Sequence, residues 1–91
     1  MNLTRYHITD TSTAGLFRFG FERAIACWRS GCTAESITHA APTASPIHRG
    51  AVAACEMLLG WRDIAEREAR AHGMTREEAA RFVAEQSEAA E

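Results

Sequence analysis

The chain has 91 residues, a formal net charge of −2 and an apolar fraction of 46%. A chain of this length forms one domain at most, and it buries only about 60% of the surface that its unfolded form exposes. The apolar fraction excludes a wholly disordered chain. No apolar run approaches the roughly 18 residues that a membrane-spanning helix needs. We therefore expect residues 1–91 to form a single small domain with no membrane partner.

All ten basic residues are arginines, and those of the second half alternate with acidic residues. This pattern is typical of a mixed, solvated surface rather than a basic footprint for nucleic acid. The first ten residues lack the charged-then-apolar order of a signal peptide. Three cysteines, an odd number, fit free thiols in a reducing compartment. We expect a cytoplasmic protein, and the charge pattern disfavours nucleic acid as its partner.

Residues 1–30 form an aromatic-rich N-terminal segment that has two interpretations. A helix over residues 14–30, ended by Gly31, gathers its apolar residues on one face and leaves Phe19 opposite them as an exposed aromatic. An exposed aromatic of this kind is typical of a partner surface. The alternation of aromatics over residues 16–21 instead favours a β-hairpin with residues 3–9. We favour the helix and keep the hairpin as the alternative.

The next segment is similar in spacing to a helix-turn-helix. Cys27 is the small residue, Gly31 makes the turn and Ile37 anchors a short second helix over residues 34–40. That second helix contains one glutamate and no arginine, whereas most protein–DNA affinity comes from neutralising phosphates. A small helix-turn-helix DNA-binding regulator is therefore the alternative function.

Residues 46–72 are predicted to form one central amphipathic helix. Ser45 is a good cap and Pro46 suits the first helical position. On a helical wheel centred on Leu58, further apolar residues flank the stripe on both sides: Val52, Met57, Leu59 and Ile64. This sector is wider than a surface helix needs, so we expect the helix to be contacted from two sides, by its own chain or by another.

Gly73 ends that helix, and Thr75 with Glu78 forms the capping box of a last helix. The last helix should fold back on the central one, so that residues 45–88 make a helical hairpin. The predicted fold is mostly α, a small domain of three or four helices around the central helix 46–72. A short N-terminal β-hairpin is the open detail.

Metal-binding and catalytic patterns are weak. Cys27 and Cys32, followed by His39 and His48, are loosely similar to a zinc-ligand set, but the two histidines lie too far apart. Cys55 falls on the apolar face of the central helix, where a thiol has a raised pKa and is unreactive. Nothing matches a phosphate loop or a nucleophile elbow. We expect no metal, no cofactor and no enzymatic activity.

Action through a surface is the function that remains. We expect a non-enzymatic protein–protein interaction module that covers part of a larger protein or self-associates as a homodimer. Such a protein would be an inhibitor or adaptor, of the kind that phages direct at a host system. Aromatic residues and arginine are enriched at interface hot spots. The candidate interaction residues are Phe19, Met57, Leu59, Trp61, Arg62 and Ile64.

Overall fold

The computed structural model describes residues 10–38 and 45–91, and the regular structure in these two stretches is helical. The helices are α1 (Thr13–Arg29), α2 (Ala34–Thr38), α3 (Pro46–Leu58), α4 (Arg62–Ala71) and α5 (Arg76–Ala90). The prediction of a mostly helical small domain is confirmed, with five helices in the described residues instead of three or four.

The described part of the N-terminal aromatic segment contains helix α1 in place of the proposed second strand. The Ser12 side chain caps α1 by accepting a hydrogen bond from the Gly15 N–H (3.1 Å). Because residues 16–21 lie inside α1, they do not form the second strand of a hairpin, and that alternative is wrong for them. The other proposed strand, residues 3–9, lies outside the described residues.

The predicted central helix 46–72 is wrong as one element, because the chain turns between α3 and α4. Gly60 has φ +93°, a left-handed conformation that a helix interior does not contain and that glycine adopts most readily. Its N–H donates to the Met57 carbonyl oxygen (2.9 Å), and the Trp61 N–H donates to the Glu56 carbonyl oxygen (2.9 Å). These two bonds are the Schellman motif that ends helices. The apolar pattern continues through the turn, so the pattern alone does not reveal it.

The same turn ends α1 at Gly31 and α4 at Gly73, as the sequence predicted for both glycines. In each of the three glycine turns, the residue after the glycine donates its N–H to the carbonyl five residues earlier, at 2.9–3.2 Å. A Schellman turn places these two residues side by side, and an apolar contact between them is usual. We call them the closing pair of each turn: Cys27 with Cys32, Glu56 with Trp61, and Ala69 with Met74.

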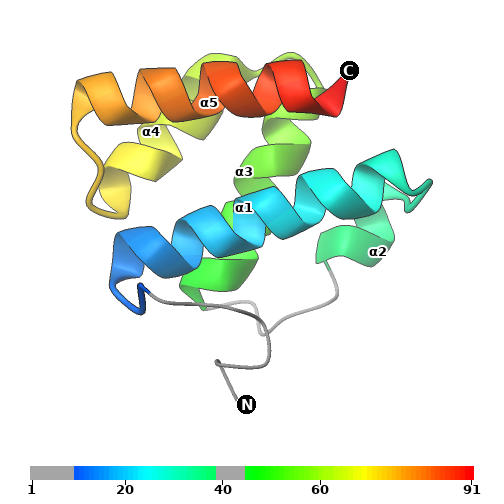
Figure 1. Ribbon diagram of the computed structural model, residues 1–91, viewed down its shortest axis with the longest axis horizontal. Helices are drawn as coiled ribbons and strands as arrows, with labels where there is room; N and C mark the ends of the chain where they lie inside the picture. Colours follow the sequence, from blue (N-terminus) through cyan, green and yellow to red (C-terminus); the bar gives the residue numbers. More distant parts are fainter. Residues whose placement is uncertain (1–9, 39–44) are drawn as a thin grey trace.

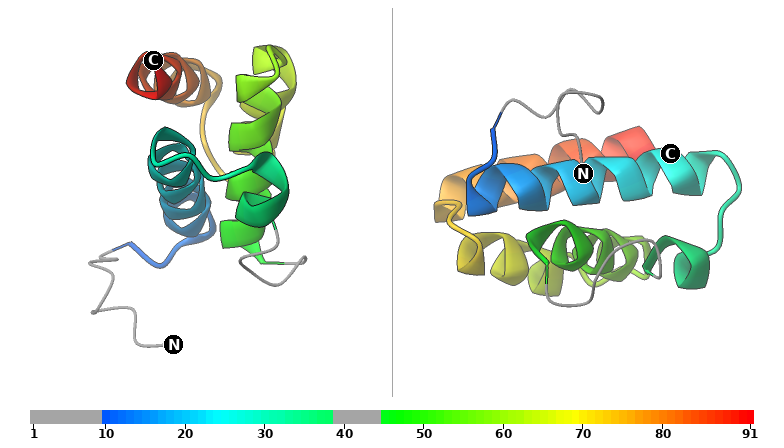
Figure 2. Two further views of the ribbon diagram at one scale, coloured as in Figure 1. Left: turned by 90° about the vertical axis from the view of Figure 1, so that its right-hand side faces the viewer. Right: turned by 90° about the horizontal axis from the view of Figure 1, so that it is seen from below.

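The helices pack in two layers. Helices α1 and α5 run side by side in nearly the same direction, and α3 crosses behind α1 at a steep angle (Figure 1). Figure 2 shows α2, α3 and α4 together in the second layer. The C-terminal ends of α1 and α5 both lie toward the right of Figure 1.

The two layers meet most closely at a pair of glycines, Gly20 on α1 and Gly50 on α3. A Cβ atom on Gly20 would overlap the Ile47 carbonyl group, with its carbon only 2.7 Å away. A Cβ on Gly50 would overlap the Phe17 carbonyl and lie 2.9 Å from the Phe21 nitrogen. The two helix backbones therefore touch, because each glycine lacks a side chain.

The core lies between these two layers, and α5 contributes buried side chains to it. Phe17, Phe21 and Val83 are fully buried. The ring of Phe21 meets that of Phe82 edge-on, with centroids 5.0 Å apart, and Phe17 stacks on His72 at 4.8 Å. Helices α1, α4 and α5 thus share one aromatic cluster.

The predicted capping box of α5 is confirmed. The Thr75 N–H donates to Glu78 Oε1 (3.0 Å), and the Glu78 N–H donates to Thr75 Oγ1 (3.1 Å). These hydrogen bonds hold the pKa of the Glu78 carboxyl below its usual value. Helices α4 and α5 consequently form the C-terminal helical hairpin, which is shorter than the predicted one because α3 is a separate element.

Candidate interaction surface

Large apolar side chains are exposed at two places in the described residues. Leu59 and Trp61, in the α3–α4 turn, are 64% and 53% exposed, and Trp28, near the end of α1, is 42% exposed. The turn therefore presents an aliphatic and an aromatic side chain on either side of Gly60. We call Leu59 and Trp61 the turn surface.

The exposure of Trp61 follows from its closing pair. In the turn after α4, the last residue, Met74, is buried and its partner Ala69 is buried too. In the turn after α3, the closing pair is Glu56 with Trp61. Because Glu56 carries a carboxylate, it does not offer Trp61 the apolar side chain that Ala69 offers Met74. The same backbone motif therefore buries Met74 and leaves the indole of Trp61 in solvent.

Trp61 also stands at the N-cap position of α4, and its side chain makes no capping hydrogen bond within the described residues. Serine, threonine, aspartate and asparagine are preferred there, and a residue that cannot cap costs a helix about 1 kcal/mol. The chain accordingly gives up stability at a position where it also exposes an aromatic ring. Departures of this kind from local preference are expected at functional positions.

The other candidate interaction residues divide between surface and core. Arg62 is exposed beside Trp61, and Ile64 is half-buried. Met57 is buried in the core of the chain itself. Phe19 is half-buried rather than exposed, and the Arg23 guanidinium lies 5.6 Å from its ring centroid. Whether these residues contact a partner stays a prediction.

Trp28 lies on the same helical face as the buried apolar residues of α1, yet its side chain is exposed. Trp28 lies one residue before the end of α1, where the neighbouring α2 is only five residues long. The sequence does contain a signal for this exposure: Trp28 lies in the last turn before Gly31, and the last turn of a helix often extends beyond the core that covers the middle of the helix.

An ion pair ties α3 to α4 behind the turn. Arg49 Nη2 lies 2.8 Å from Glu68 Oε2. Glu56 lies near this pair: partial burial raises the pKa of its carboxyl, the Glu68 charge raises it further, and Arg49 opposes both. Because both side chains are partly exposed, the ion pair contributes at most about 1 kcal/mol to the contact between the two helices that flank the turn.

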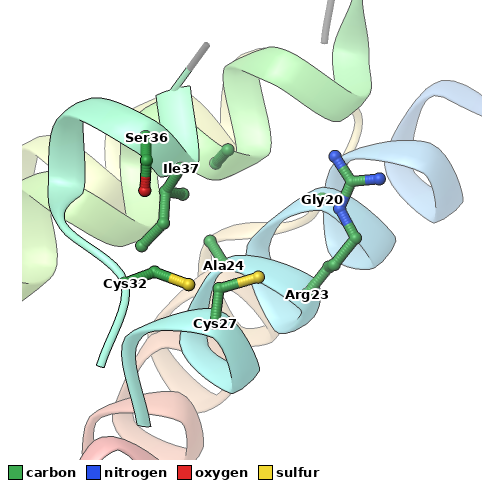
Figure 3. A pocket seen from close by; sticks show the side chains of 8 residues that line it. Gly20, Arg23, Ala24, Cys27, Cys32, Ser36 and Ile37 are labelled. Atoms are coloured by element: carbon green, nitrogen blue, oxygen red, sulfur yellow. The ribbon is translucent and has the colours of Figure 1, made fainter. Parts of the chain in front are cut away.

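The cysteines lie apart from the turn surface. Cys27 and Cys32 line a cavity of about 50 Å³ between α1, α2 and α3, together with Arg23, Ser36 and Ile37 (Figure 3). Cys55 is buried, as predicted, and burial raises the pKa of its thiol, with a smaller contribution from the Glu56 charge. No group of three or more metal-binding side chains forms in residues 10–38 and 45–91. His39 lies outside these ranges.

The helix-turn-helix spacing agrees with the local structure. Helix α1, the turn at Gly31 and α2 occur in the predicted order, and Ile37 is buried as an anchor. Helix α2 spans Ala34–Thr38, and Glu35 is its one charged residue. The DNA-binding alternative stays a prediction that this geometry does not test.

Comparison with protein-family models, with curated proteins and with solved structures finds no match to this chain. Within the described residues, no helix combines the length and apolar character required to span a membrane.

Proposed function

We propose that the protein is a non-enzymatic protein–protein interaction module whose turn surface inserts into an apolar pocket of a larger protein. The observation that supports this proposal is the exposure of Leu59 and Trp61 together in one tight turn. The inhibitor or adaptor role expected from the sequence belongs to this proposal.

A rigid turn suits an anchor of this kind. The backbone of residues 59–61 is held by hydrogen bonds to the end of α3, so docking requires little further ordering of the main chain. Removing roughly 200 Å² of apolar surface from water at these two side chains favours association by about 5 kcal/mol before entropic costs. Exposed Arg62 and Asp63 carry opposite charges at the edge of the surface, which suits a polar rim around the apolar pocket.

The test uses the full chain as bait in a lysate, compared with Trp61→Ser and Leu59→Ser variants. Trp28→Ser is the matched control, because it also removes an exposed large side chain but lies on α1. We expect a protein that the wild type and Trp28→Ser retain and that both turn variants lose. With that protein purified, Trp61→Ser should weaken binding by about 2 kcal/mol, which is roughly thirtyfold in Kd.

Sedimentation equilibrium of the wild type separates the two kinds of partner. A dimer that Trp61→Ser dissociates would identify a second copy as the occupant and would exclude the larger partner. A monomeric wild type that captures nothing beyond what the turn variants capture would refute the interaction function altogether.

A further inference from the structure

Cys27 and Cys32 are the closing pair of the α1 turn, and their geometry has a consequence separate from the turn surface. The Cys32 N–H donates to the Cys27 carbonyl oxygen (3.0 Å), and the Gly31 N–H donates to the Trp28 carbonyl oxygen (3.0 Å). The backbone therefore holds the two cysteines side by side, in the relation in which a Schellman turn usually has a side-chain contact.

The hydrogen bond also limits the distance between the two Cα atoms. With standard bond lengths on either side of a 3.0 Å contact, the Cα atoms of Cys27 and Cys32 lie within about 7 Å even in the most extended arrangement. The angles at the carbonyl and at the amide shorten this further. Disulfides bridge Cα atoms roughly 4.4–6.8 Å apart, so the α1 turn holds the pair in the range that a disulfide requires.

The two side chains face a common space. Both line the cavity between α1 and α2, and Figure 3 shows the Cys32 sulfur directed toward Cys27 while the Cys27 sulfur points away from Cys32. Rotation of the Cys27 side chain about its Cα–Cβ bond would turn its sulfur toward Cys32. Cys32 is exposed and Cys27 is half-buried, so a dissolved oxidant reaches Cys32 first. The third thiol, Cys55, is buried and accepts no such approach.

We propose that Cys27 and Cys32 form a reversible intramolecular disulfide, which makes the α1 turn a redox-sensitive modification site. The oxidant is a small-molecule disulfide such as oxidised glutathione. The Cys32 thiolate attacks one glutathione sulfur and releases the first glutathione thiolate. The Cys27 thiolate then attacks the Cys32 sulfur and releases the second. Two protein thiols are oxidised, one oxidised glutathione is reduced to two glutathione molecules, and the two thiol protons pass to these products.

The bond closes the short loop of the α1 turn and ties the start of α2 to the end of α1. If folding raises the equilibrium constant for disulfide formation, the disulfide must raise the equilibrium constant for folding by the same factor. The oxidised protein should therefore melt at a higher temperature than the reduced protein.

The experiment equilibrates the full chain in glutathione buffers of varied ratio, blocks free thiols by alkylation and measures the intact mass. We expect a species that lacks two hydrogen atoms and protects two cysteines from alkylation, and Cys55→Ser should form it equally well. Cys27→Ser should instead accumulate glutathione on Cys32, because the second thiol that would displace it is absent.

The same equilibrium in concentrated urea measures what the fold contributes. We expect the equilibrium constant for disulfide formation to fall about tenfold or more on unfolding, since a flexible chain holds the two thiols together less often. An equal or higher constant in urea would overturn the proposal, as would a product in which the cysteines carry only glutathione or link two chains. This comparison uses the wild type and does not depend on whether any variant folds.

Discussion

Replacing Gly20 by alanine tests the backbone contact between α1 and α3. The new Cβ would lie 2.7 Å from the Ile47 carbonyl carbon and 2.9 Å from its Cα, with the carbonyl oxygen closer still. Ordinary contacts of a Cβ begin at 3.4 Å, so the carbonyl carbon alone is 0.7 Å too near. Both sides of the contact are backbone, and the overlap can be relieved only if one helix moves away from the other.

That movement sets the size of the effect. A gap of 0.5–1 Å forfeits about a quarter to a half of the dispersion attraction between the separated surfaces. Overpacking in a core costs about 1–3 kcal/mol, and occasionally more. The higher helix propensity of alanine offsets about 1 kcal/mol of this cost, because alanine is more favourable than glycine inside a helix. Because the overlap is with backbone atoms, we take the overpacking cost at the top of its range, about 3 kcal/mol. We therefore expect Gly20→Ala to lower the free energy of unfolding by about 2 kcal/mol, a large part of the roughly 5–15 kcal/mol that a small domain has.

Urea unfolding followed by far-ultraviolet circular dichroism measures this difference. The matched control is Ala26→Gly, an exposed position of the same helix, which should cost about 1 kcal/mol through helix propensity alone. Gly50→Ala should resemble Gly20→Ala. The double variant should lose less than the sum of both, because one shift of α3 relieves both overlaps. If Gly20→Ala is as stable as the wild type, or more stable, the two helices do not meet at this point.

Three further predictions follow from local interactions. Thr75→Ala should lower stability by about 1 kcal/mol and the Tm by about 4–8 °C in a thermal melt, because the hydroxyl that accepts from the Glu78 N–H is lost while the backbone N–H of residue 75 can still donate to Glu78. Thr75→Ser should restore most of this stability. The folded pKa of Glu78 lies below its unfolded value. The contribution of Glu78 to the free energy of unfolding is therefore present above the ordinary glutamate pKa of about 4.3 and is lost as the pH falls through the lowered folded-state pKa. In Glu78→Gln, the free energy of unfolding should consequently fall less steeply as the pH is lowered through this range. Met57→Ala should lower the free energy of unfolding by about 2–4 kcal/mol in urea, because Met57 is buried. Trp61→Asp should leave this free energy unchanged or raise it by up to about 1 kcal/mol, because Trp61 is exposed and aspartate caps a helix. A large loss of stability in Trp61→Asp would show that the Trp61 ring lies in the core.

The parts of the fold that the sequence predicts are those with a local chemical cause. Ser45 accepts from the His48 N–H at the start of α3, and the capping box of Thr75 and Glu78 starts α5. Gly31 and Gly73 end helices where an apolar pattern also ends. In each case one or two side chains decide the backbone conformation, so neighbours in the sequence carry enough information.

The features that escape the sequence depend on neighbours in space. Gly60 ends α3 inside an unbroken apolar pattern, and the turn is favoured because α4 can then pack back on α3 and α5. Gly20 and Gly50 gain their roles only when α1 and α3 cross. The wide apolar sector assigned to one helix is thus largely the combined surface of two helices with different directions, and Met57 is covered within the chain's own core.

The three glycine turns separate what the backbone determines from what the side chains determine. All three have the same pair of hydrogen bonds and a positive φ at glycine, between 93° and 103°. Their closing pairs differ: Ala69 and Met74 extend the core. In the turn after α3, the position equivalent to Ala69 is Glu56, and Trp61 lies in solvent, where a partner can reach it. Placing two thiols at the same positions brings Cys27 and Cys32 within reach of a shared bond. One helix-ending motif therefore supplies a core contact, the proposed binding anchor and the proposed redox site, and the identities of the two residues that close it decide which of these it becomes.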